Sequence, residues 1–164
     1  MSKSLLILGA GGHGFVIKEV AEACGYDKID FLDDNNPSAI GRISEFDKIV
    51  RCYDEYIIGI GNNKIRKMLS EKVGQNGCIA TLIHPSAYIS PSCSVGKGTV
   101  VEPKAIINAR SLIGKGCIIS VGSIVDHDAI IGNYTHINAG AIIKAGGSVD
   151  SEIIVQAGDI VSGF

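Results

Sequence analysis

Residues 113–131 read IGKGCIISVGSIVDHDAII, and they contain the pattern that decides the fold. Ile or Val returns at every sixth position, and a small residue follows four positions after each of them. The branched residues keep one register from position 83 to position 161: Ile83, Ile89, Val95, Val101, Ile107, Ile113, Ile119, Val125, Ile131, Ile137, Ile143, Val149, Val155 and Val161. A run of this length in a single frame indicates a repeat architecture.

A six-residue repeat is too short for a helix with its loop, but it is a multiple of the two-residue period of a strand. Each repeat can therefore turn its stiff, branched side chain inward. The pattern predicts an all-β parallel β-helix over residues 83–164, with three short strands per coil and each coil stacked on the next. Left-handed or Asx turns are expected where small polar residues recur: Gly96, Asn108, Gly114, Asp126, Gly132 and Asn138.

The composition excludes several classes of function. The net charge of −2 gives no reason to expect a nucleic acid or an acidic membrane surface as partner. No apolar stretch approaches the ~20 residues of a membrane span, and the short run 5–8 breaks at once into glycines, so we expect no membrane span and no signal peptide. The five cysteines show no paired spacing, which favours a reducing cytoplasm.

Residues 1–82 are expected to form a separate α/β domain. The apolar run 4–8 is followed by Gly9-Ala10-Gly11-Gly12-His13-Gly14, a helical pattern over 15–24, and a second strand over 29–32 that ends in Asp33-Asp34. This order is typical of a Rossmann-like βαβ unit, in which glycines and a helix N-terminus approach a pyrophosphate. The alternative is a glycine turn that only joins a strand to a helix.

The remainder of this domain is expected to add a strand over 56–60, a helix over 64–72 and a fourth strand over 79–83. Gly61 follows the third of these strands, and its turn would line the same crevice. These strands are too few for a full dinucleotide-binding domain that carries a hydride acceptor, and the polar segment 35–55 receives no assignment.

The histidines of the repeat occupy outward or turn positions, because aliphatic and small residues take the inward ones. His127 stands between Asp126 and Asp128, and a carboxylate beside an imidazole favours a general base. A solvated turn histidine is the alternative. His136 lies half a coil further on, so the two histidines would point from different faces of one chain and could meet across a subunit boundary. The metal alternative is a three-histidine zinc site like that of the hexapeptide-repeat carbonic anhydrases. His84 is too far from the other two histidines to bind the same zinc ion, so no metal is expected.

Five stretches together resemble one family of proteins: Gly9–Gly14, Phe31–Asp34, Ile60–Lys67, Ile83–Ala87 and Val125–Gly132. The chain is similar to the bacterial nucleotide-sugar N-acetyltransferases and sialic-acid O-acetyltransferase-like proteins. Among these it most resembles the N-acetyltransferases that act on UDP-4-amino sugars in bacillosamine synthesis. The resemblance implies a Rossmann-like domain that holds a UDP-sugar, a left-handed β-helix, and a homotrimer that binds acetyl-CoA between neighbouring subunits.

The resemblance also implies roles for individual residues. His127 matches the general base, which would take a proton from the sugar amine as it attacks the thioester, and Asp128 matches the acid beside it. His136 matches a histidine that contacts acetyl-CoA, and a backbone N–H near Ala145 and Gly146 would stabilise the oxyanion. Six further positions match the nucleotide-sugar site: Gly12, His13, Gly14, Asp33, Asp34 and Gly61.

The chain departs from the family pattern in three ways. The Ala145-Gly146-Gly147 stretch is shifted by one residue against the repeat, which leaves the oxyanion donor open. Ser120 stands where the relatives have Asn. The family usually continues for further coils that grip coenzyme A, whereas this chain ends at Phe164 after about four and a half expected coils. The alternatives are therefore a sugar O-acetyltransferase, and a non-catalytic module that binds nucleotide-sugars without a complete coenzyme A site.

Overall fold

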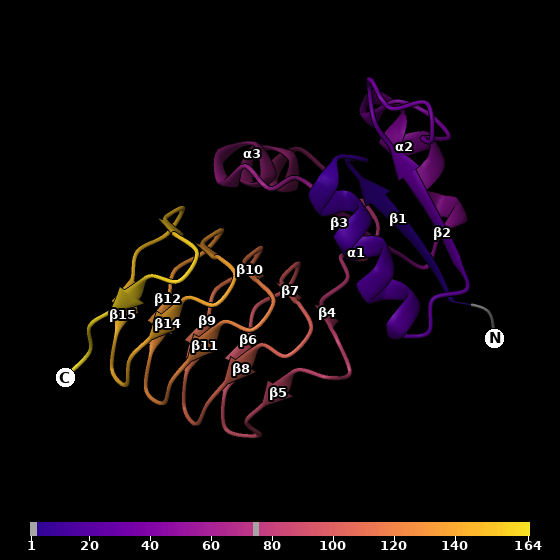
Figure 1. Cartoon of the computed structure of the whole chain (residues 1–164). Coiled ribbons are helices and arrows are strands. Elements are labelled where there is room, and N and C mark those ends of the chain that lie inside the picture. The colour runs from indigo at the N-terminus through magenta and orange to yellow at the C-terminus, as the bar shows by residue number, and fades with distance from the viewer. Residues whose placement is uncertain (1–2, 74–75) are drawn as a thin grey trace. The chain divides into compact units, whose positions relative to one another are not determined.

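The computed structural model describes residues 3–73 and 76–164. The chain forms two compact units, one that ends at Leu82 and one that runs from Ile83 to Phe164 (Figure 1).

The first unit is built on a three-stranded parallel sheet with the order β2-β1-β3. Its strands are β1 (Ser4–Leu8), β2 (Lys28–Leu32) and β3 (Glu55–Ile58). The central strand β1 pairs with both neighbours, and its apolar residues 5–8 are fully buried. This burial explains why β1 reads as a continuous apolar run, since a central parallel strand is covered on both faces.

Among its described residues, the first unit also contains two main helices and three short helical turns. They are α1 (Gly12–Ala23), α3 (Asn63–Val73), α2 (Phe46–Ile49) and the 3₁₀ turns η1 (Ile43–Glu45) and η2 (Val50–Cys52). The helix predicted over 15–24 begins three residues earlier, because Gly11 is its N-cap and accepts the N–H of Phe15 at 3.1 Å. The unassigned segment 35–55 contains α2, whose buried Phe46 packs in the core beside Tyr56.

The fourth strand predicted over 79–83 is wrong as a strand of this sheet. Ile79 forms only an isolated bridge with Tyr56, and Leu82–Ile83 is β4, the first strand of a β-helix sheet. The two parts of one apolar run thus belong to different sheets, a division that hydrophobicity alone does not reveal.

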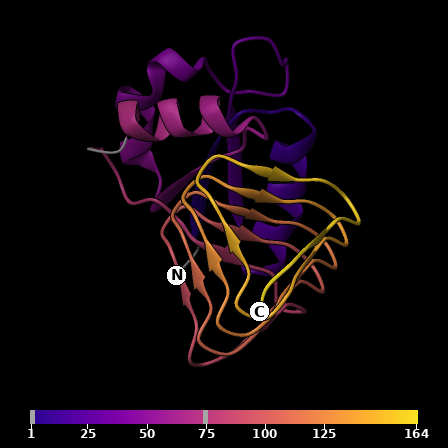
Figure 2. The same cartoon turned by 90° about the vertical axis from the view of Figure 1, so that its left-hand side faces the viewer.

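The second unit is a parallel β-helix, as the six-residue period predicts. Two-residue strands form three parallel sheets, with the orders β16-β13-β10-β7-β4, β17-β14-β11-β8-β5 and β15-β12-β9-β6. Figure 2 shows its coils stacked one behind another. The strands are β4 (Leu82–Ile83), β5 (Tyr88–Ile89), β6 (Ser94–Val95), β7 (Val100–Val101), β8 (Ile106–Ile107), β9 (Leu112–Ile113), β10 (Ile118–Ile119), β11 (Ile124–Val125), β12 (Ile130–Ile131), β13 (His136–Ile137), β14 (Ile142–Ile143), β15 (Ser148–Val149), β16 (Ile154–Val155) and β17 (Ile160–Val161).

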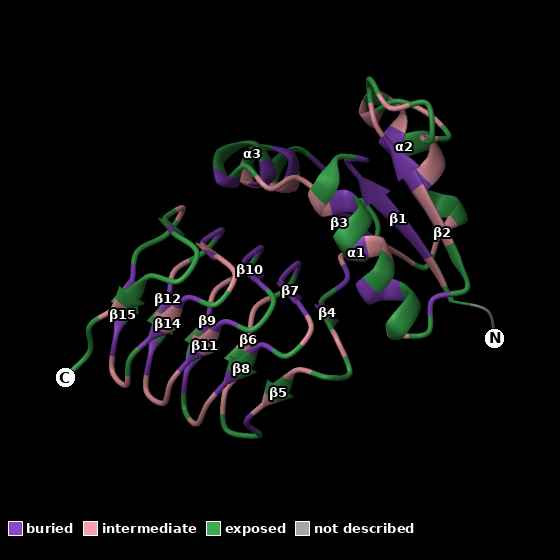
Figure 3. Cartoon of the chain, viewed as in Figure 1, coloured by how far each residue is buried: buried purple, intermediate pink, exposed green. Residues whose placement is uncertain are grey.

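The core of the β-helix is the column of inward aliphatic residues predicted from the sequence. From Val101 to Val155 every member of the series is buried, together with small residues such as Ala129 (Figure 3). Ile83 at the first strand is exposed and Val161 at the last is partly exposed. Packing from neighbouring coils therefore completes the burial of each rung.

Backbone conformation at the turns repeats with the same period as the core. Every sixth residue from Gly98 to Gly158 has a positive φ, and five of these positions are not glycine: Lys104, Arg110, Asp128, Tyr134 and Glu152. The predicted turn glycines 96, 114 and 132 lie two positions earlier and do not have positive φ. Close packing between coils explains these glycines instead. A Cβ at Gly96, for example, would lie 2.5 Å from the backbone of the next coil.

None of the helices in the described part of the chain is long and apolar enough to cross a membrane. All five cysteines are free thiols.

Candidate functional site

The glycines after β1 have two different structural roles. Gly9 has a φ of +110°, a conformation that favours glycine. A Cβ on Gly14 would overlap the Gly9 carbonyl group, so only glycine lets the backbone of helix α1 approach the loop this closely. Gly59, at the end of β3, packs against the same backbone. In contrast, added Cβ atoms on Gly11 and Gly12 would meet open space. The beginning of α1 is therefore accessible to a ligand, and the positive end of the helix dipole favours an anion there.

Asp33 ties the end of β2 to the glycine loop. Its Oδ2 accepts the N–H of Ala10 at 2.8 Å, and its Oδ1 accepts the N–H groups of Asn35 at 2.8 Å and Asn36 at 2.9 Å. These hydrogen bonds lower the pKa of the Asp33 carboxyl, and the bond from Ala10 has the largest effect. Asn36 completes the link by donating from Nδ2 to the Ala10 carbonyl at 2.7 Å. The carboxylate predicted to belong to the nucleotide-sugar site thus also shapes the loop.

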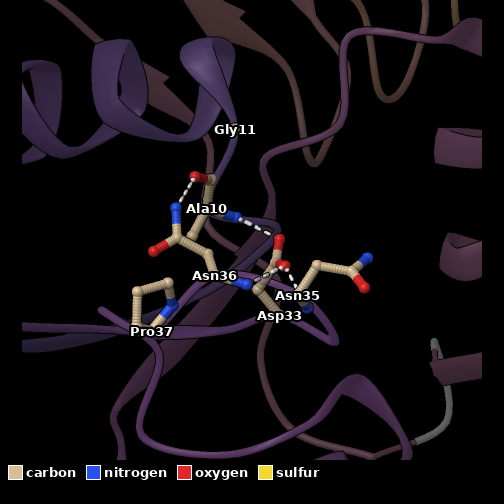
Figure 4. Close-up of a pocket in the computed structure, with 6 residues that line it drawn as sticks. All are labelled: Ala10, Gly11, Asp33, Asn35, Asn36 and Pro37. Carbon is tan, nitrogen blue, oxygen red and sulfur yellow. Dashed lines mark hydrogen bonds between the residues drawn. The ribbon is translucent and has the colours of Figure 1, made fainter.

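A pocket of about 300 Å³ lies at this loop (Figure 4). Its lining consists of Ala10, Gly11, Asp33, Asn35, Asn36 and Pro37. Of the predicted nucleotide-sugar residues, only Asp33 lines it. Sequence reasoning missed the turn 35–37, although two asparagines and a proline directly after a strand-end acid are a recognisable turn signal.

The other predicted residues of this site lie near the pocket without lining it. Gly61 follows β3, and a Cβ there would lie 3.9 Å from the Cβ of His13 in the first turn of α1. The turn after β3 and the start of α1 are therefore neighbours, as expected at the carboxyl edge of a parallel sheet. Asp34 is exposed, and its Oδ1 accepts the N–H of Ile43 at 3.2 Å.

Arg66 is a buried residue of this edge that sequence reasoning missed. Only 2% of it is exposed, and its Nη1 donates to the carbonyls of Ile60 at 3.0 Å and Gly61 at 2.9 Å. Its Nη2 donates to Oδ1 of Asn63 at 2.7 Å. The guanidinium group therefore fixes the backbone of the turn that contains Gly61.

In the second unit, His127 follows β11 and forms a dyad with Asp128. The Nδ1 atom of His127 lies 2.7 Å from Oδ2 of Asp128. The guanidinium of Arg110, and then His127, hold the pKa of the Asp128 carboxyl down to about 2. An ionised carboxylate can only accept hydrogen bonds, so Nδ1 carries the proton of the neutral ring and Nε2 presents its lone pair. This is the tautomer that a general base needs.

Asp126, on the other side of His127, supports the backbone. Its Oδ1 accepts the N–H of His127 at 2.7 Å and the Nδ2–H of Asn108 at 3.0 Å, and these bonds lower its pKa. Asn108 belongs to the preceding coil, 18 residues earlier. The two acids predicted beside the imidazole therefore act differently, because Asp126 holds the main chain and Asp128 holds the ring.

The Ala145–Gly146 stretch lies one coil after the dyad. The Gly146 N–H donates to the carbonyl of His127 at 2.9 Å, so this predicted oxyanion donor is already engaged. The N–H of Ala145 has no acceptor within residues 3–73 and 76–164, and its carbonyl accepts the N–H of Phe164 at 3.2 Å. The ring of Phe164 lies 6.3 Å from that of His127 between centroids.

His136 lies elsewhere on the β-helix. It is part of β13, and its Nε2 lies 2.9 Å from Oγ of Ser120. Since β13 and β11 belong to different sheets, a single chain does not bring His136 and His127 together. Among the described residues there is also no group of three or more His, Cys, Asp or Glu side chains that could hold a metal ion.

Comparison with known proteins connects both units to enzymes. The PglD N-terminal domain family matches residues 4–73. The acetyltransferase domain of PglB from Neisseria gonorrhoeae FA1090 superposes with a TM-score of 0.87 at 30% identity, over 99% of this chain and 92% of that one. The chain belongs to the nucleotide-sugar N-acetyltransferase family. The same PglB domain is known in complex with acetyl coenzyme A, with a TM-score of 0.83 and 31% identity over 96% of this chain and 90% of that chain.

Two other relatives are described together with a nucleotide-sugar. UDP-N-acetylbacillosamine N-acetyltransferase of Bacillus subtilis (strain 168) is 35% identical over an alignment of 110 residues, and the alignment covers 60% of this chain and 51% of that protein. This chain thus spans about half the length of that relative. PerB from Caulobacter crescentus, in complex with CoA and GDP-perosamine, has a TM-score of 0.83 at 29% identity, over 98% of this chain and 89% of that chain.

Proposed function

We propose that this chain transfers the acetyl group of acetyl-CoA to the amino group of a UDP-4-amino-4-deoxy sugar. The observation that carries the proposal is the His127–Asp128 dyad, in which an ionised Asp128 directs the Nε2 lone pair of His127 outward. Family membership supports acetyl transfer, and the B. subtilis relative supports a UDP-linked acceptor.

The proposed mechanism is direct transfer. Nε2 of His127 removes a proton from the sugar amine as its nitrogen attacks the thioester carbonyl, and a tetrahedral oxyanion forms. The N–H of Ala145, rather than the engaged N–H of Gly146, is the proposed donor to that oxyanion. When the C–S bond breaks, the coenzyme A thiolate leaves and receives the proton from His127. His136, Ala145 and Gly146 are the proposed contacts for acetyl-CoA.

For the nucleotide-sugar we propose the pocket at the start of α1. The open approach to Gly11 and Gly12 suits a pyrophosphate, because a helix N-terminus attracts an anion and no side chain blocks it there. Asn35 and Asn36 add polar groups to the pocket wall. His13, Gly14, Asp33, Asp34 and Gly61 complete the proposed site, some as ligand contacts and some, such as Gly14, through the close packing that shapes it.

The chain is also proposed to act as a homotrimer. On one sheet of the β-helix the outward residues pair into an unbroken apolar ladder: Tyr88, Ile106, Ile124, Ile142 and Ile160. More than half of Tyr88 and of Ile160 is exposed in the single chain. A contiguous apolar face of this kind marks an association surface, and we assign it to further copies of this chain. A cytoplasmic location is our expectation from the free thiols.

A thiol-release assay with acetyl-CoA and a UDP-4-amino sugar tests the activity. We expect turnover that is lost in His127→Ala, while full activity of this variant would overturn the assignment of the base. GDP-perosamine and a sialic acid serve as competing acceptors, and faster turnover with either would replace the proposed substrate. Calorimetry that detects UDP-sugar binding but no acetyl-CoA binding would instead identify a non-catalytic module.

A further inference from the structure

Arg110 and Asp128 form a two-pronged ion pair between successive coils. The Nε of Arg110 donates to Oδ1 of Asp128 at 2.7 Å, and its Nη2 donates to Oδ2 at 2.6 Å. Oδ2 is the same oxygen that accepts from Nδ1 of His127. Arg110, Asp128 and His127 thus form a continuous chain of hydrogen bonds in which the carboxylate is the middle member.

Both members of the ion pair occupy unusual backbone positions. Arg110 has a φ of +58° and Asp128 a φ of +60°, in the left-handed region that favours glycine. They are 18 residues apart, so they occupy the same turn of consecutive coils. Gly146 takes the next equivalent position. Because Tyr134 and Glu152 stack in the same conformation elsewhere on the β-helix, the positive φ alone gives the pair no special role. Its two hydrogen bonds, by contrast, connect Arg110 directly to the dyad.

We propose that Arg110 is a positioning residue for acetyl transfer, which holds the Asp128 carboxylate in the orientation that fixes the His127 ring. This inference rests on the proposed function. Both side chains of the dyad are partly exposed, 43% for the His127 side chain and 31% for that of Asp128. A planar guanidinium that binds both carboxylate oxygens restrains the orientation of the carboxylate.

The exposure of the pair separates this role from a purely structural one. The Arg110 side chain is 65% exposed, and ion pairs at such positions contribute little to stability. Loss of the pair should therefore leave the fold nearly as stable, while the imidazole loses its fixed orientation. An arginine that instead binds the phosphates of coenzyme A would affect substrate affinity and leave the ring unchanged.

Lys104 provides a matched control. It has a φ of +59°, and its N–H donates to Oγ of Ser86 at 3.2 Å, just as the N–H of Arg110 donates to Oγ of Ser92 at 3.2 Å. Lys104 forms no ion pair within the part of the chain that the structure describes. Lys104→Met thus removes a positive charge from an equivalent turn without touching the dyad.

The experiment compares Arg110→Met, Arg110→Lys and Lys104→Met by steady-state kinetics and by ¹⁵N NMR of the His127 ring in the free protein. For Arg110→Met we expect kcat to fall about 10-fold with little change in the KM for acetyl-CoA, because a misoriented base slows the chemical step. We expect the neutral ring to be a single Nδ1–H tautomer in the unmodified chain and to become a mixture of tautomers in Arg110→Met. Arg110→Lys keeps the positive charge but loses the two-pronged hydrogen bonding, so its kcat should lie between those of Arg110→Met and the unmodified chain. The kcat and the tautomer of Lys104→Met should match those of the unmodified chain.

An unchanged tautomer in Arg110→Met would overturn the inference, and so would a rise in KM with kcat unaffected. Melting temperatures of the variants should stay within about 3 °C of the unmodified chain. A larger loss confined to both Arg110 variants would show a structural role instead and overturn the inference. If the unmodified chain transfers no acetyl group, the proposed function fails, whereas the NMR comparison still decides whether Arg110 orients His127.

Discussion

The carboxylate of Asp33 accepts the backbone N–H of Ala10 at 2.8 Å, so the end of β2 holds the loop that leads from β1 into α1. Because that loop forms part of the pocket wall, the acid and the glycines form one structural unit.

Asp33→Asn is expected to lower the free energy of unfolding by about 1 kcal/mol at pH 7, since a neutral amide accepts backbone N–H groups more weakly than a partly exposed carboxylate. The pKa of Asp33 is lowered in the folded chain, so its contribution is complete above the unfolded value of ~3.9 and is lost as the pH falls below it. Urea unfolding at pH 7 and pH 3 should therefore show a difference that shrinks in acid. Asp34→Asn is the control, with one backbone contact at 3.2 Å.

Gly14→Ala and Gly12→Ala should have opposite effects on stability. The first places a methyl group on the Gly9 carbonyl and should cost about 3 kcal/mol or prevent folding, because the neighbour is rigid backbone. The second meets open space within α1 and should stabilise by a few tenths of a kcal/mol to about 1 kcal/mol. Thermal unfolding measures both. Weaker UDP-sugar binding by the well-folded Gly12→Ala chain would support a ligand at this helix start, and unchanged binding would contradict it.

Arg66→Met is expected to destabilise the first unit by about 3 kcal/mol, because it removes a buried guanidinium that donates to the partly buried Ile60 and Gly61 carbonyls. Lys64→Met, an exposed cation on the same helix α3, should change stability by less than about 0.5 kcal/mol. Chemical unfolding followed by circular dichroism compares the two. Equal effects would mean that the buried guanidinium does not hold this turn.

Ile106→Lys should dissociate the proposed trimer, because it introduces a charge into the middle of the apolar ladder between Tyr88 and Ile124. Light scattering should give three times the chain mass for the unmodified protein and a single chain mass for the variant. Ile65→Lys changes an aliphatic residue of similar exposure on α3 and should leave the mass unchanged. A monomeric unmodified chain would rule out the trimer.

The β-helix could be predicted from the sequence because its core depends on a local period. Each inward residue, such as Val125, packs on residues one coil away that obey the same rule, so the pattern and the fold carry the same information. The strand–glycine–helix unit was predictable for a similar reason, because Gly9 to Asp33 is a short and contiguous signal.

The missed features depend on contacts between distant positions. Arg110 looks like any exposed turn residue until the coil length places it beside Asp128, and Arg66 looks like one more cation of an amphipathic helix although it is buried. The spacing of 18 between Arg110 and Asp128 was the available signal, and it becomes meaningful only when the coil is known to contain three six-residue rungs. The prediction of a strand over 79–83 in the first sheet was wrong because the two ends of this apolar run pair with different sheets.

The column that joins Arg110, Asp128 and Gly146 also restricts how the chain can tolerate insertions and deletions. Adding six residues between Arg110 and Asp128 would preserve the alternation of aliphatic and small residues, and the chain would still form a parallel β-helix. It would nevertheless rotate the arginine to another edge and separate it from the carboxylate. Adding a whole coil of 18 residues there would restore the edge but would place another coil between the two side chains. The pairing therefore requires that Arg110 and Asp128 stay 18 residues apart, so natural length variation should fall outside the interval between them.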